Sequence, residues 1–135
     1  MSVLSGRPFP IAIQITDPGA DMRIPLLRVP TGHTYTVERC DIVPDTTAAA
    51  STANYWEAAL ENAGVSGTAQ AVISGTAGGT AGWVLNTPQN VTITAGSGDL
   101  TEGQYLNLKY NEEGTIAPGR FTVFLEVVDG IGSKA

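Results

Sequence analysis

The chain is built from short runs in which apolar and polar residues alternate, and a turn closes each run. In the clearest run, residues 9–16, every second residue from Phe9 onward is apolar, and Asp17-Pro18-Gly19 follows as a turn. Alternation with a period of two places alternate side chains on opposite faces of a β-strand. About nine such runs recur at roughly ten-residue spacing. The pattern predicts an all-β protein: an antiparallel β-sandwich or jelly roll of about eight or nine short strands.

The N-terminal run is expected to stand apart from the rest. Pro8 and Pro10 cannot donate hydrogen bonds to a neighbouring strand, so the run belongs at a sheet edge or in an extended arm. We therefore predict an N-terminal arm with edge strands over residues 1–30, a sandwich domain over residues 31–130 and a flexible tail over residues 131–135. The apolar side chains of the arm are its expected anchors on another chain: Phe9, Ile11, Ile13 and Ile15.

Three other segments need interpretation. In residues 35–43 the alternation changes phase, which predicts a β-bulge or bend near Glu38-Arg39. Residues 54–63 fit a helix with a capping box, or a strand; the surrounding β pattern favours the strand, and both remain open. Residues 75–82 are rich in Gly, Thr and Ala and are expected to form a loop.

The last run, residues 120–128, carries apolar side chains on both faces. Phe124 and Val128 lie on the face opposite to the main apolar set. A strand that is apolar on both faces is covered on both faces. It is therefore either central in the sandwich or part of a subunit interface, and Phe124 and Val128 are the residues we expect at such an interface.

Charge excludes two classes of partner. The chain has 7 Lys and Arg against 13 Asp and Glu, a net charge of −6. A nucleic-acid binder needs a basic surface, and so does a protein that docks on an anionic membrane, so neither partner is expected. The N-terminus lacks the layout of a signal peptide, and no run of about 18 apolar residues is present. We expect the chain to fold where it is made.

The chain offers little material for catalysis. Cys40 and His33 are its single cysteine and single histidine, too few for a disulfide or a zinc site. Seven positions apart on a strand, they would be separated by about 23 Å, too far for a nucleophile and its base. The sequence Gly64-Val65-Ser66-Gly67-Thr68 lacks the second glycine of a nucleophile elbow. We predict a protein that is not an enzyme, with no cofactor and no metal.

A binding module is the alternative. Four aromatic residues could form a platform for sugars, although the two tryptophans are expected in the core: Tyr55, Trp56, Trp83 and Tyr105. A carbohydrate-binding or receptor-binding jelly-roll module, with a surface glycan as partner, therefore stays open beside an assembly role.

The C-terminal half contains a distinctive series of short sequence segments that are read as strands and turns. They are Ala95-Gly96-Ser97-Gly98-Asp99-Leu100-Thr101-Glu102-Gly103, Leu106-Asn107-Leu108-Lys109-Tyr110, Glu113-Gly114-Thr115 and Pro118-Gly119-Arg120-Phe121-Thr122-Val123, preceded by Asn54-Tyr55-Trp56 and Glu61-Asn62-Ala63-Gly64. Through these segments, residues 33–128 resemble the jelly-roll head decoration (cement) proteins of tailed bacteriophages. The two segments within residues 54–64 look like a strand and turn of that family, which supports a strand over residues 54–63.

The resemblance implies a role and a location. Decoration proteins of this kind form homotrimers on the capsid exterior, at three-fold or quasi-three-fold points. There they brace neighbouring major capsid subunits against the pressure of the packaged DNA. The resemblance therefore implies a structural virion protein, made in the host bacterial cytoplasm, whose partners are its own copies and the major capsid protein. The alternative, a carbohydrate-binding or receptor-binding module, would then belong to a phage fibre or baseplate. Residues 1–30, outside the clear match, would then be the arm that contacts the capsid or a neighbouring subunit.

Overall fold

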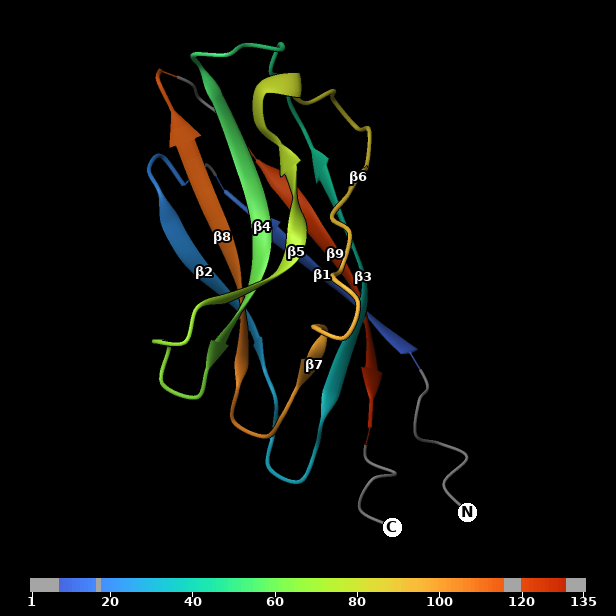
Figure 1. Cartoon of the computed structure of the whole chain (residues 1–135). Coiled ribbons are helices and arrows are strands. Elements are labelled where there is room, and N and C mark those ends of the chain that lie inside the picture. Colours follow the sequence, from blue (N-terminus) through green and yellow to red (C-terminus); the bar gives the residue numbers. More distant parts are fainter. Residues whose placement is uncertain (1–7, 17, 116–119, 131–135) are drawn as a thin grey trace.

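A computed structural model describes residues 8–16, 18–115 and 120–130 as two antiparallel β-sheets packed as a sandwich (Figure 1). Sheet A has the strand order β1 (Pro8–Ile15), β9 (Phe121–Asp129), β3 (Tyr35–Pro44) and β6 (Gln89–Asn90), with β7 (Asp99–Leu100) also paired to β3. Sheet B has the order β2 (Met22–Arg28), β8 (Tyr105–Glu113), β4 (Tyr55–Gly64) and β5 (Ala71–Gly78). A short 3-10 turn, η1 (Gly79–Ala81), follows β5. The predicted all-β sandwich of about nine strands is confirmed.

The connectivity is that of a jelly roll. The chain runs out through β1, β2, β3 and β4 and returns through the later strands, each of which pairs with an earlier one. Thus β9 pairs with β1, β8 with β2, β6 and β7 with β3, and β5 with β4. Rolling this long hairpin brings β9 beside β3 and β8 beside β4, which completes the two sheets.

One side of the sandwich is closed and the other is open. The chain after β6 bridges to β5 through Ser74 and Ile93, where the Gly75 N–H donates to the Thr92 carbonyl at 2.8 Å. On the opposite side, β1 and β2 each pair with one strand only among the described residues. The free edges of the molecule therefore lie along β1 and β2.

The core is centred on stacked aromatic rings. The Trp56 and Trp83 rings are parallel to within 10°, with centroids 3.9 Å apart, and Phe121 lies 4.9 Å from Trp56. The Trp83 Nε1–H donates to the Trp56 carbonyl at 2.9 Å. Both tryptophans are at most 1% exposed, which confirms that they belong to the core.

Two local predictions are confirmed and one is wrong. Val37 pairs with Val127 and Arg39 with Glu126, so Glu38 is the extra residue of a β-bulge. Residues 55–64 form a strand because β8 on one side and β5 on the other supply backbone partners that a helix there would leave unpaired. The loop predicted over residues 75–82 starts too early, because β5 continues to Gly78 in register with β4.

The N-terminal segment forms edge strands, as its prolines predicted, and these strands belong to the sandwich rather than to a separate arm. All eight residues of β1 pair with β9, and β2 pairs with β8, so no boundary appears at residue 30. The four predicted anchor residues pack against or within the core of their own chain: Phe9, Ile11, Ile13 and Ile15. Phe9, Ile11 and Ile13 are half-buried and Ile15 is buried, and their contact with another chain stays a prediction. Residues 1–7 and the predicted tail at 131–135 lie outside the described residues.

Candidate interaction surface

The outer face of sheet A carries an apolar patch with an aromatic centre. Since alternate residues of β1 and β9 point into the core, the others point outward. Phe124 on β9 is 45% exposed and is flanked in register by Ala12 on β1 and Asp41 on β3. The next row along the sheet consists of Pro10, Glu126 and Arg39. These six residues are referred to below as the Phe124 patch.

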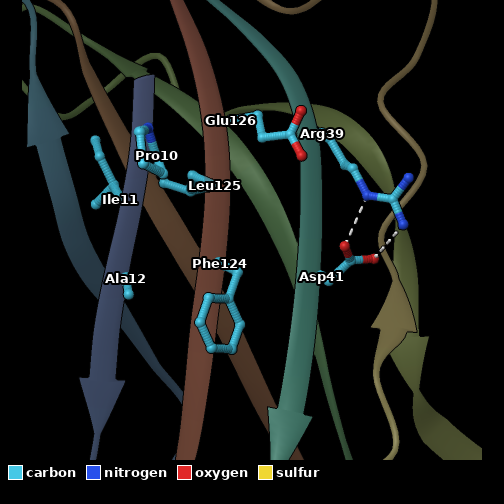
Figure 2. Close-up of a pocket in the computed structure, with 8 residues that line it drawn as sticks. All are labelled: Pro10, Ile11, Ala12, Arg39, Asp41, Phe124, Leu125 and Glu126. Carbon is cyan, nitrogen blue, oxygen red and sulfur yellow. Dashed lines mark hydrogen bonds and ion pairs between the residues drawn. The ribbon is translucent and has the colours of Figure 1, made fainter. Parts of the chain in front are cut away.

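A shallow hollow lies in this patch (Figure 2). Its lining also includes Ile11 and Leu125. Figure 2 shows the Phe124 ring standing on β9 between β1 and β3, with the Arg39 and Asp41 side chains on its β3 side. An exposed aromatic ring beside a hollow gives a rigid apolar anchor that can bind another surface.

The charged side of the patch is held in place before any partner arrives. Arg39 donates to both Asp41 oxygens, at 2.7 and 3.4 Å, and Asn90 donates to Asp41 Oδ1 at 3.2 Å. Burial alone would raise the pKa of Asp41, but the hydrogen bonds from Arg39 and Asn90 and the charge of Arg39 bring it below its ordinary value. The Arg39 pKa is raised, chiefly by its hydrogen bond to Asp41. Glu126 forms no ion pair with the other described residues.

The residues predicted at a subunit interface lie on this face. Val128 is half-buried on the outer side of β9, in a row with Pro8 and Thr36, two rows from Phe124. Because β9 lies between β1 and β3, it is the central strand that its two-sided apolar pattern suggested. A contact with another chain through Phe124 and Val128 stays a prediction.

A second surface, which the sequence did not reveal, lies on the outer side of β2 and β8. Arg23 pairs in register with Lys109, and Arg28 with Tyr105. The Arg23 Nε–H donates at 2.7 Å to Oε1 of Glu61, a carboxylate on β4 with no exposed surface. Arg23 and Lys109 are 86 positions apart, so only the strand pairing brings them together. Arg23 and Arg28 are five positions apart, so regular alternation would place them on opposite faces of a strand, and the register shift at Leu26 is what brings them to the same side.

A hollow borders this second surface at the edge of the sandwich. It is lined mostly by apolar atoms of β2 and β8 residues: Pro25, Leu26, Leu27, Arg28 and Tyr105. The register shift between Pro25 and Leu27 makes Leu26 the extra residue of a second bulge. This hollow and the basic residues Arg23, Arg28 and Lys109 are referred to below as the β2 edge.

The candidate catalytic residues are not assembled into a site. Cys40 has no exposed surface, and burial raises the pKa of its thiol to about 12. His33 Nδ1 lies 3.0 Å from both carboxylate oxygens of Asp129. Within the described ranges, no three or more His, Cys, Asp and Glu side chains are grouped so that they could hold a metal ion.

The candidate sugar platform is divided between the core and the surface. Trp56 and Trp83 are buried, whereas Tyr55 and Tyr105 are half-buried at the two ends of sheet B, on strands β4 and β8.

The described part of the chain contains no helix whose length and hydrophobicity would let it span a membrane.

Comparison with models of known protein families finds no match, and a search of curated proteins finds no relative of this chain.

Proposed function

We propose that the chain is a structural virion protein of a tailed bacteriophage. It acts as a homotrimeric decoration (cement) protein that binds the outside of the capsid and stabilises contacts between major capsid subunits. The observation that carries the proposal is the Phe124 patch, an exposed aromatic anchor on the outer face of a jelly-roll sheet. The resemblance of residues 33–128 to jelly-roll decoration proteins supplies the kind of partner.

The patch has the composition of a protein contact. Binding energy in such contacts concentrates in a few aromatic and arginine residues, and Phe124 and Arg39 lie in adjacent rows here. Arg39 is already held by Asp41, so docking would restrict it less than a free arginine side chain.

The mechanism is multivalent clamping. A trimer presents three copies of each capsid contact, and linking them raises the apparent affinity well above that of one contact. Phe9, Ile11, Ile13 and Ile15 pack on or within the core of their own chain, so we place the main contact at the Phe124 patch, and a contact through the four arm residues stays a prediction.

Two measurements test the proposal on the full chain. Light scattering at micromolar concentration should give three times the mass of the chain. Capsids of the encoding phage, prepared without this protein, should retain it during gradient sedimentation. A monomer that never sediments with those capsids contradicts the proposal.

The patch itself is tested by a matched pair of substitutions. Phe124→Ser should lower retention on capsids at least about tenfold, since the trimer that provides multivalency weakens. Leu85→Ser, at a residue 47% exposed against 45% for Phe124, should leave retention unchanged. Equal effects of the two variants would remove Phe124 from the contact. Circular dichroism verifies that both variants are folded.

A further inference from the structure

The Phe124 patch and the β2 edge both carry exposed apolar surface beside a shallow hollow. One presents an exposed aromatic ring on a sheet face, and the other a mostly apolar hollow at a strand edge. The hollow contains Leu26, which the β2 bulge takes out of the regular alternation. A ring that stands out from one surface and a hollow of apolar side chains on another can bury each other from water.

The two surfaces also differ in charge. The outer side of sheet A carries more acidic than basic residues: Glu38, Asp41, Asp99 and Glu126 against Arg39. The β2 edge holds three of the five basic residues in the described ranges: Arg23, Arg28 and Lys109.

Each surface carries an excess of charge of one sign. Arg23 and Lys109 lie directly opposite each other, an unfavourable pairing of like charges. Glu61 neutralises Arg23, but Lys109 has no ion pair with a described residue. Glu126 in the Phe124 patch lies in register beside Arg39, but this one arginine faces several acidic side chains on the outer side of sheet A. A basic partner surface would balance that acidic excess, and an acidic one would pair with Lys109.

We infer that these surfaces bind each other in a head-to-tail contact between copies of the chain. Phe124 of one copy occupies the hollow at the β2 edge of the next, and Glu126 faces Arg28, which lines that hollow. The inference deepens the proposed function, on which it rests for the number of copies.

A second copy is the occupant because this one chain supplies both complementary surfaces. Each copy carries one of each, so the contact repeats from copy to copy. The hollow lies along the edge strand β2. A head-to-tail contact closes into a ring where the rotation between successive copies closes, and it gives an open assembly where the rotation does not.

Disulfide cross-linking between two single variants tests the geometry. Phe124→Cys and Leu26→Cys are made separately, mixed in equal amounts at high micromolar concentration and oxidised. The expected product is a cross-linked dimer that requires both variants. Cys40 does not compete, since it is buried and its pKa is raised to about 12. Leu85→Cys, at an exposed residue outside both surfaces, is the control and should cross-link with neither.

Other products would overturn the inference. A cross-linked dimer from Phe124→Cys alone would mean that two Phe124 patches face each other. Absence of cross-linking in the mixture, with both variants folded, would leave the Phe124 patch to a different partner such as the capsid protein.

A charge exchange gives an independent measurement. Glu126→Arg and Arg28→Glu should each weaken self-association at least about tenfold, and the chain with both changes should recover it. Failure of the double variant to recover contradicts the pairing. None of these assays uses capsids. Cross-linking without capsid binding rejects the decoration role alone, and capsid binding without cross-linking rejects the head-to-tail contact alone.

Discussion

At the scale of single residues, Gly78 explains why a glycine-rich segment is part of the sheet. Gly78 has φ +78°, and a Cβ added there would overlap the indole of Trp83. Glycine accepts that backbone conformation without strain and leaves room for the ring. The Trp83 ring can then stack on Trp56 in the centre of the core.

Gly78→Ala is expected to lower the free energy of unfolding by roughly 2–5 kcal/mol, from backbone strain together with overpacking. Gly96 is the matched control, since it has the same φ of +78° but nothing within 4 Å of an added Cβ. Gly96→Ala should cost only the strain, about 1–2 kcal/mol. Urea denaturation measures both. Equal losses of unfolding free energy in the two variants would show that the overlap with Trp83 adds no cost to Gly78→Ala.

The buried thiol of Cys40 predicts a dependence of stability on pH. Its pKa rises from 9.0 to about 12 in the folded chain because burial disfavours the thiolate. The folded state therefore holds the proton more tightly, and this contribution is complete below about pH 9. It falls as pH rises from about 9 to 12, by about 1.4 kcal/mol per unit.

Cys40→Ala supplies the comparison for that prediction. The variant should be less stable than the original chain at pH 7, because it leaves a small cavity. The difference should shrink between pH 9 and pH 11 in denaturant titrations at each pH. A difference that stays constant over this range contradicts the assigned cause.

At the scale of elements, a charged pair connects strands that are not neighbours. Arg23 on β2 reaches across β8 to Glu61 on β4, and Asn107 on β8 donates to the same Glu61 oxygen at 3.3 Å. The Glu61 side chain has no exposed surface, whereas that of Arg23 is 42% exposed. The pair holds the edge strand β2 to the centre of sheet B.

Arg23→Met should destabilise the chain by roughly 1–3 kcal/mol, because a buried carboxylate then loses its charged partner. Solvent screening at the half-exposed arginine keeps this below the cost of breaking a fully buried pair. Adding Glu61→Leu should recover part of the loss. Arg120→Met breaks the exposed pair with Asp45 and should cost at most about 1 kcal/mol. Thermal unfolding ranks the variants; equal losses for Arg23→Met and Arg120→Met would contradict the bracing role.

At the scale of the whole molecule, β1 decides whether the N-terminal region is a separable arm. Ile11 and Ile13 face the core, and Ala12 and Gln14 face outward. Replacing the inward pair, Ile11→Ser with Ile13→Ser, should lower the free energy of unfolding by roughly 2–4 kcal/mol, less than for fully buried residues. The outward pair, Ala12→Ser with Gln14→Ser, should change it by less than about 0.5 kcal/mol. Denaturant unfolding that finds both pairs neutral would restore the free-arm interpretation.

Much of the fold was readable from local pattern. Alternation assigned Phe121 and Phe124 to opposite faces of their strand, and a phase change predicted a bulge or bend near Glu38-Arg39, which the structure has at Glu38. The candidate surface was readable only in part: Phe124 and Val128 were singled out, but Arg39 and Asp41 beside them were not. The β2 edge was missed because its basic residues meet only after β2 and β8 pair.

The sequence by itself determined which side chains share a face of each strand, since alternation is a property of the local backbone and needs no partner. The tertiary structure decided which strands pair, and therefore which residues are buried and which residues lie opposite each other. It turned the apolar side chains of β1 inward against the core, extended β5 to Gly78, joined Ser74 to Ile93 and set Arg23 opposite Lys109. Such contacts join residues far apart in the chain. They depend on how the whole hairpin rolls up, because each pairing must close a long loop and bury its apolar face at the same time.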